Sequence, residues 1–273
     1  MDAILKMIQD SANLDLSHYK KSSIERSVNR RMHARDIQSL PGYVSLLETD
    51  PQELHALVSD VTVDFSLFFR DEKLFDLLKD SVLPELIRQS RAGAGRPVRA
   101  WCAGCGAGEE AYSVAILLFE ALKGSAGRER VTIFATDVDP ASLAKSRAAA
   151  YSEESARDIP HTVLERYFSL DGGYRIKSFI KDLICFGRHN LISDPPISRI
   201  DLLLCRNVLI YLDKEGQLVV LRRLRYAVRP GGYLVLGKSE SLPRDIGDSF
   251  EVVDRTLKIF RRKDDDKCIF PYS

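Results

Sequence analysis

Apolar residues recur at helical spacing through the first ninety residues of the chain. Ile24, Val28 and Met32 return every four residues, and a second amphipathic run covers residues 74–87. No convincing alternation of apolar and polar positions, which would indicate strands, interrupts this region. The pattern therefore predicts an all-helical N-terminal domain over residues 1–88.

The pattern changes after residues 89–97, a stretch rich in glycine, serine and arginine that we interpret as a linker. Short apolar runs then alternate with helical stretches, as is typical of βαβ units and a mostly parallel sheet. We expect an α/β domain over residues 98–267 and a tail at 268–273. The predicted strands are 98–103, 131–136, 202–205 and 233–237, and the predicted helices are 111–122, 141–150 and 217–228.

Residues 167–190 do not fit this alternation. A turn signal at 171–173 precedes a β-like run at 174–176, and a second β-like run follows at 183–186. We therefore expect a small antiparallel β-insertion at about residues 167–190. Near the C-terminus, residues 250–260 predict a hairpin that closes the edge of the sheet.

Composition narrows the class of protein. The 273 residues carry 40 basic and 39 acidic side chains, a net charge of +1, so a broad nucleic-acid-binding surface is not expected. The longest apolar run is far shorter than the ~20 residues that span a bilayer, and the N-terminus lacks a secretory pattern. Five scattered cysteines fit reduced thiols, so we expect a cytoplasmic protein.

Three glycines follow the first predicted strand at alternate positions. Gly104, Gly106 and Gly108 would let the backbone approach a ligand closely, just before a helix whose free N–H groups face the same place. The spacing differs from the G-x-G-x-x-G of dinucleotide-binding proteins. It resembles the nucleoside-binding loop of methyltransferases that use S-adenosylmethionine. A tight strand-to-helix turn without a ligand is the alternative.

Acidic residues around this loop point to a cationic nucleoside. Glu109 and Glu110 would attract a sulfonium or an ammonium group, although both could simply complement the helix dipole. Asp137 ends the second predicted strand, where α/β nucleoside binders hold ribose hydroxyls; NAD enzymes share this feature. Asp139, directly before Pro140, is expected to cap the next helix.

Several short motifs follow one another along the chain. They are Phe68-Phe69-Arg70-Asp71, Ala103-Gly104-Cys105, Gly108-Glu109-Glu110-Ala111-Tyr112-Ser113, Ala135-Thr136-Asp137, His189-Asn190-Leu191, Cys205-Arg206-Asn207-Val208-Leu209-Ile210-Tyr211 and Arg229-Pro230-Gly231-Gly232. In this order they resemble the motifs of the CheR-type chemotaxis receptor methyltransferases, and the likeness covers nearly the whole chain. The segment 205–211 is the most specific of them.

The resemblance implies a Rossmann-like S-adenosylmethionine-dependent methyltransferase domain with a small antiparallel insertion and an all-helical N-terminal domain. It implies a protein-glutamate O-methyltransferase. This enzyme would form glutamate methyl esters on the cytoplasmic helices of methyl-accepting chemotaxis receptors during sensory adaptation, leaving S-adenosylhomocysteine. The protein would meet the membrane only through these receptors. The β-insertion could contact a receptor tail peptide, or the receptor helices could supply every contact.

The resemblance also implies site residues. Arg70 and Tyr211 would face the methyl group and the acceptor carboxylate as catalytic residues, although an interdomain ion pair and a core tyrosine are alternatives. Asn190 and Leu191 would frame the adenine. The implied cofactor contacts are Asp64, Ser66, Arg70, Gly104, Glu110, Asp137, Asn190, Leu191, Arg206 and Asn207. A glutamate acceptor is already ionised at neutral pH, so the reaction needs positioning rather than a general base.

Two departures from the family bear on function. Ser66 replaces the usual Thr and keeps its hydroxyl, whereas Asp64 replaces the usual Asn and adds a negative charge. Asp64 leaves open the alternative of a non-catalytic S-adenosylmethionine-binding adaptor in a receptor signalling array. A nucleic-acid or small-molecule methyltransferase is less well supported, because Asp194-Pro195-Pro196-Ile197 lies before its strand and lacks the final aromatic residue of the corresponding motif.

A basic segment lies between residues 18 and 35, with one acid, Glu25, among its cations. A glutamate-rich receptor helix would suit this face, although a solvated helix face is the alternative. The docking residues that we expect are Lys20, Lys21, Arg26, Arg30, Arg31 and Arg35. No metal site is predicted, because the C-x-x-C of Cys102 and Cys105 lies inside the glycine loop without further paired ligands.

Overall fold

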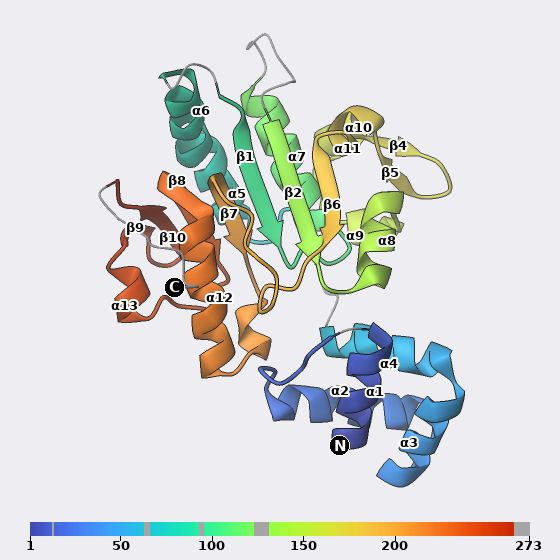
Figure 1. Ribbon diagram of the computed structural model, residues 1–273. Helices are drawn as coiled ribbons and strands as arrows, with labels where there is room; N and C mark the ends of the chain where they lie inside the picture. The colour runs from blue at the N-terminus through green and yellow to red at the C-terminus, as the bar shows by residue number, and fades with distance from the viewer. Residues whose placement is uncertain (13, 63–65, 93–95, 123–130, 265–273) are drawn as a thin grey trace.

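The computed structural model describes residues 1–264 except 13, 63–65, 93–95 and 123–130. Its centre is a seven-stranded sheet, in which five parallel strands are followed by an antiparallel hairpin at one edge (Figure 1). The strands, in spatial order, are β6 (Ile184–Arg188), β2 (Val131–Asp137), β1 (Val98–Ala103), β7 (Ile200–Cys205), β8 (Val228–Leu236), β10 (Ile259–Arg262) and β9 (Phe250–Asp254). The predicted parallel sheet and its C-terminal edge hairpin are confirmed.

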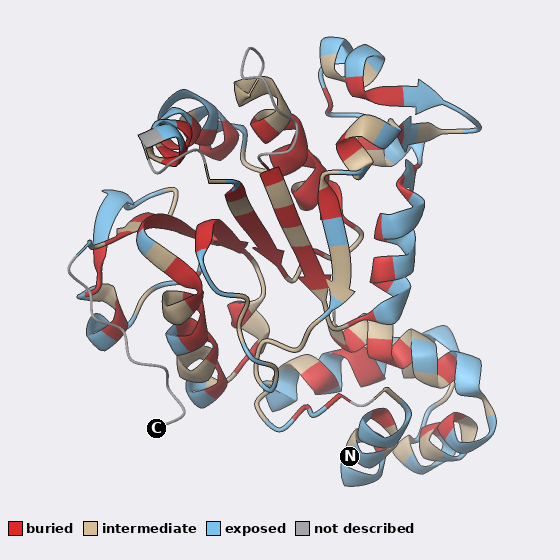
Figure 2. Ribbon diagram, turned by 45° about the horizontal axis from the view of Figure 1, so that its top comes forward, coloured by how far each residue is buried: buried red, intermediate tan, exposed pale blue. Residues whose placement is uncertain are grey.

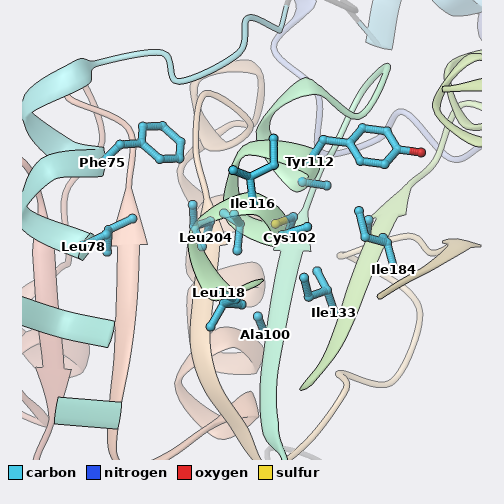
Figure 3. Packing of buried hydrophobic residues seen from close by; sticks show 14 of the residues in the cluster. Phe75, Leu78, Ala100, Cys102, Tyr112, Ile116, Leu118, Ile133, Ile184 and Leu204 are labelled. Carbon is cyan, nitrogen blue, oxygen red and sulfur yellow. The ribbon is translucent and has the colours of Figure 1, made fainter. Parts of the chain in front are cut away.

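Helices cover both faces of this sheet, which buries the central strands along most of their length (Figure 2). Alternate residues of β1 serve the two faces: Ala100 and Cys102 pack in one cluster, Trp101 and Ala103 in the other. Figure 3 shows Ile116 of α7 beside Cys102 in the first cluster. The covering helices are α7 (Glu109–Ala121) and α8 (Pro140–Ala148) on the first face, and α12 (Lys214–Ala227) and α13 (Arg244–Gly247) on the second.

The predicted antiparallel insertion is present, but one of its strands was wrongly assigned. The three-stranded antiparallel sheet has the order β3-β5-β4. The run 183–186 lies instead in β6, which pairs in parallel with β2 in the main sheet, because the chain returns to that sheet once the insertion ends. The insertion consists of β3 (Ala150–Tyr151), α9 (Glu153–Ala156), α10 (His161–Tyr167), β4 (Phe168–Leu170), β5 (Tyr174–Ile176) and α11 (Ser178–Lys181).

The first four helices form a separate cluster at the end of the sheet toward which the parallel strands point (Figure 1). They are α1 (Asp2–Ala12), α2 (Lys21–Ala34), α3 (Leu40–Thr49) and α4 (Pro51–Thr62). None of the helices in the described ranges combines the length and the apolar character that a membrane crossing requires.

The predicted helix over residues 74–87 packs with the sheet. It comprises α5 (Glu72–Leu77), a π-helical turn η1 (Leu78–Val82) and α6 (Leu83–Ala92), and most of its apolar residues belong to the first sheet cluster. We therefore propose a division between the two parts of the chain near residue 62, earlier than the expected boundary at 88. Residues 89–92 of the expected linker are helical, and the expected tail at 268–273 lies outside the described residues.

A buried carboxylate ties the N-terminal helices together. Glu53 accepts hydrogen bonds from Arg31 at 2.6 and 2.9 Å and from the Tyr43 hydroxyl at 2.9 Å. Burial alone would raise the pKa of Glu53, but these hydrogen bonds and the charges of Arg31 and Arg35 outweigh it and lower the pKa. The ionised Glu53 therefore contributes stability above the unfolded-state pKa of ~4.3, and this stability is lost as the pH falls through the lower folded-state value.

Glu53→Gln should lower the free energy of unfolding at pH 7 by about 3 kcal/mol, because it leaves Arg31 without its buried counter-charge. Urea denaturation between pH 7 and pH 3 measures the effect, and the difference from the parent protein should shrink toward the acid end. Glu48→Gln, on the exposed side of α3, is the matched control. An effect of the Glu53 variant that stayed constant with pH would contradict this account.

Candidate functional site

A cavity opens at the carboxyl ends of the parallel strands, where the first helices meet the sheet. Every described residue of the expected site lines this cavity, so the fold brings these residues together. Their position alone does not assign a role to any of them. These residues are Ser66, Arg70, Gly104, Glu110, Asp137, Asn190, Leu191, Arg206, Asn207 and Tyr211. Asp64 lies outside the described residues.

The glycine loop is built for close approach. Gly104 has a φ of +72°, and a Cβ there would lie 2.3 Å from Cγ2 of Val208 in the neighbouring loop. At Gly108, with a φ of +97°, a Cβ would lie 2.8 Å from that of Ser146. A side chain at either position would push the loop away from its neighbours, so glycine is required at both ends. Between them, Gly106 lines the cavity with its backbone.

Asp137 closes this loop from the next strand. Its carboxylate accepts hydrogen bonds from the Gly106 N–H at 2.8 Å and the Asp139 N–H at 3.0 Å. Burial raises the pKa of Asp137 despite these two donors. A carboxylate oxygen can accept more than one hydrogen bond, so Asp137 can still bind a hydroxyl in the cavity. Asp139 caps α8 as predicted, through the N–H groups of residues 141 and 142.

An ion-pair chain supports the opposite wall. Arg206 donates to Glu110 at 2.6 Å and also to Asp71, which in turn pairs with Lys238. Burial would raise the pKa of Asp71, but these two cations lower it. Of the two glutamates considered from the sequence, Glu110 lines the cavity, whereas Glu109 is buried and does not.

Arg70 and Tyr211 both line the cavity. Phe69 and Asp71, on either side of Arg70, have φ values of 49° and 69°, so the chain bends sharply here. The Phe69 N–H donates to the Ser113 hydroxyl at 2.9 Å and stabilises this bend. Burial raises the pKa of Tyr211, and the positive charge of Arg70 opposes this shift. Tyr211 therefore remains a neutral hydrogen-bond donor at physiological pH.

The N-terminal helices reach the cavity through one extended segment. The Lys20 N–H donates to the Tyr211 carbonyl at 2.9 Å, and the Asp213 N–H donates to the His18 carbonyl at 2.8 Å. The Lys20 ammonium adds a bond to the Ile210 carbonyl at 2.7 Å. This pairing, which we call the 18–20 clip, brings Tyr19 into the cavity wall, where no sequence motif had pointed to it.

Glu240 is a second residue that sequence reasoning missed. Its buried carboxylate accepts from the backbone N–H groups of Asn207, Leu209 and Gly237, at 3.2, 2.8 and 2.6 Å. Burial raises the pKa of Glu240, and the three donors oppose this shift. The carboxylate thus holds the loop that carries Arg206 and Tyr211.

The described residues contain no cluster of three or more histidine, cysteine or acidic side chains that could hold a metal. Burial raises the pKa of Cys102 and of Cys105 well above the ordinary thiol value, so neither is a ready thiolate ligand or nucleophile.

Comparison with known proteins matches both parts of the chain to one family. The model of the CheR methyltransferase SAM-binding domain covers residues 64–259, and that of the CheR methyltransferase all-alpha domain covers residues 1–62. Chemotaxis protein methyltransferase 1 of Pseudomonas aeruginosa is 33% identical over 262 residues, which cover 93% of this chain and 94% of its own. The chemotaxis protein methyltransferase of Borreliella burgdorferi is 27% identical over 89% of this chain and 88% of its own.

An uncharacterized 104.1 kDa protein of Rhodobacter capsulatus is 40% identical over 259 residues. The match covers 94% of this chain but 27% of that protein. A chain of this type therefore also occurs as one part of a much longer protein.

Glu240→Gln should lower the free energy of unfolding by about 2 kcal/mol. The carboxylate has two oxygens that accept from the three N–H groups, whereas the amide has only one acceptor oxygen. The substitution should also weaken methyl transfer by loosening the loop that carries Tyr211. Urea denaturation and a methyl-transfer assay measure the two effects. Glu251→Gln, on the exposed edge strand β9, should change stability by less than about 0.5 kcal/mol. Equal effects of the two variants would refute the assigned role of Glu240.

Proposed function

The chain belongs to the CheR methyltransferase family, and on this premise we propose that it transfers a methyl group from S-adenosylmethionine to glutamate side chains of chemoreceptors. The observation that carries the proposal is that one cavity is lined by two carboxylates, Asp137 and Glu110, which can accept from a ribose and an ammonium group, and also by Arg70 and Tyr211. In this proposal the enzyme is a protein-glutamate O-methyltransferase.

The cavity suits S-adenosylmethionine chemically. The Asp137 carboxylate would accept from the ribose, and Glu110 would face the ammonium group. Leu191 and the Asn190 amide would frame the adenine. Gly104, Ser66, Arg206 and Asn207 would complete the cofactor site, together with Asp64 from outside the described residues. When bound, the cofactor supplies an electrophilic methyl group on a sulfonium and leaves as S-adenosylhomocysteine.

Positioning of the acceptor is the chemical task left to the protein. An acceptor glutamate is ionised at neutral pH, so its carboxylate oxygen would accept the methyl group from the sulfonium without a general base. The Arg70 guanidinium can bind the second carboxylate oxygen and orient the attack. Tyr211 can donate a further hydrogen bond without adding charge. Such alignment can contribute several kcal/mol to the rate.

The receptor would dock beside Arg70 and Tyr211. Of the six docking cations expected between residues 18 and 35, Arg30, Arg31 and Arg35 pair with Asp60, Glu53 and Asp50 in the same helical part. We therefore centre the docking face on Lys20, Lys21 and Arg26, the last of which is close enough to Tyr211 to act on it electrostatically. The β-insertion would offer a second contact, for a receptor tail peptide, at the exposed Leu170 of β4.

Arg70→Ala should reduce the methylation rate of receptor membranes by at least about 100-fold at saturating cofactor, since the acceptor loses its orienting cation. Transfer of tritiated methyl groups measures the rate, and release of the label by base identifies a carboxyl ester. Arg70→Lys keeps the charge but not the bidentate geometry, so its methylation rate should lie between those of the parent protein and of Arg70→Ala.

Full activity of Arg70→Ala would remove Arg70 from the mechanism. A parent protein that binds S-adenosylhomocysteine but labels no receptor would favour the alternative, a non-catalytic adaptor in a receptor signalling array.

Lys21→Glu and Arg26→Glu should each raise the KM for receptor several-fold, because they place a negative charge opposite a glutamate-rich helix. The affinity for S-adenosylhomocysteine should stay unchanged. Rising salt should weaken receptor methylation in the parent protein more than in these variants. Arg157→Glu, which alters an exposed cation on the insertion, is the control. An equal rise in KM for the control would exclude a docking face on α2.

A further inference from the structure

Among the residues that the structure describes, Tyr19 is the one aromatic side chain that the first helical cluster shares with the cavity and with the cluster around α12. Both its neighbours in the sequence are bound to the loop that carries Tyr211, through the 18–20 clip. The ring is therefore held in place before any ligand binds. An ordered side chain loses little conformational entropy when it makes a new contact.

The Tyr19 hydroxyl is available to a ligand. Among the described residues, none hydrogen-bonds to it, and its oxygen is not one of the buried polar atoms sealed from solvent. A tyrosine hydroxyl in a largely apolar wall usually finds a partner. Apolar residues of the clusters that contain Tyr19, among them Val138, Leu191 and Ile192, also line the cavity, so a ligand bound in the cavity can supply the partner.

Tyr19 and Asp137 line the same cavity. Burial raises the pKa of Tyr19 to about 12, and the negative charge of Asp137 adds to the shift. Tyr19 is consequently neutral at physiological pH and can both donate and accept a hydrogen bond. Val138, which packs in the same cluster as Tyr19, directly follows Asp137 in the chain.

We propose that Tyr19 is a cofactor-binding residue contributed by the N-terminal helices, whose hydroxyl hydrogen-bonds to one of the two ribose hydroxyls beside Asp137. The inference rests on the proposed function, since it assumes that the cavity binds the adenosyl moiety. A vicinal diol offers two donors and two acceptors, more than one carboxylate can satisfy, and Tyr19 supplies the second partner. The cofactor site then spans both parts of the chain.

Calorimetric titration with S-adenosylhomocysteine and with its 2′-deoxy and 3′-deoxy analogues tests this contact without relying on activity. Tyr19→Phe keeps the ring and should weaken binding of S-adenosylhomocysteine about three- to tenfold, the effect of one neutral hydrogen bond. For the analogue that lacks the contacted hydroxyl, the same substitution should change the Kd less than twofold. For the other analogue the full loss should persist. Tyr174→Phe, in β5 of the insertion, should change none of the three affinities.

An unchanged affinity of Tyr19→Phe for S-adenosylhomocysteine would overturn the inference. Equal losses for all three ligands would overturn it too, because they would indicate a packing defect instead of a ribose contact. Either result would leave the proposed function standing as long as the parent protein binds S-adenosylhomocysteine. Failure of the parent protein to bind it would overturn the proposed function itself.

Discussion

The geometry of the cavity depends on the ion pairs that the buried guanidinium of Arg206 forms with Glu110 and Asp71. The Arg206 side chain is 3% exposed, and a charge so removed from water must be paired. Its partners come from two different elements, Glu110 at the start of α7 and Asp71 at the start of α5. Arg206 itself follows the last residue of β7. One side chain thereby fixes the relative positions of three segments that are remote in sequence, including the bend that presents Arg70.

The second constraint is the 18–20 clip, which attaches the N-terminal helices to the loop after β7. The attachment needs room at the first turn of α12, where a Cβ on Gly216 would lie 2.8 Å from that of His18. Asp213 serves both sides of the joint, because its N–H donates to His18 and its side chain caps α12 through the Gly216 N–H at 2.7 Å. The helical part is therefore a structural component of the cavity.

The sequence predicted best what local patterns determine. Strand β1 and its glycine loop were found because a buried parallel strand and a close turn both leave a local signature. The run 183–186 was misplaced because an edge strand of a parallel sheet has the same short apolar pattern as a hairpin strand, and its partner is chosen by distant residues. The amphipathic pattern of residues 74–87 likewise revealed a buried face but not the surface that covers it.

The residues that sequence reasoning missed share one property: their partners are distant in sequence or are backbone groups. Glu240 accepts hydrogen bonds from backbone N–H groups, which every residue except proline has and which therefore leave no sequence signal. Tyr19 is held against Leu212, a residue almost two hundred positions later in the chain. Spacing rules detect neither case.

The ion pairs in the structure also change which ligand the charges around the cavity favour. Two adjacent glutamates suggested a cationic ligand, yet Glu109 is buried and does not line the cavity, and Glu110 forms an ion pair with Arg206. With Asp137 and Arg70 added, the wall contains both anionic and cationic groups. Such an arrangement suits a zwitterion better than a simple cation, because each charge of the ligand meets its opposite without an excess charge being buried.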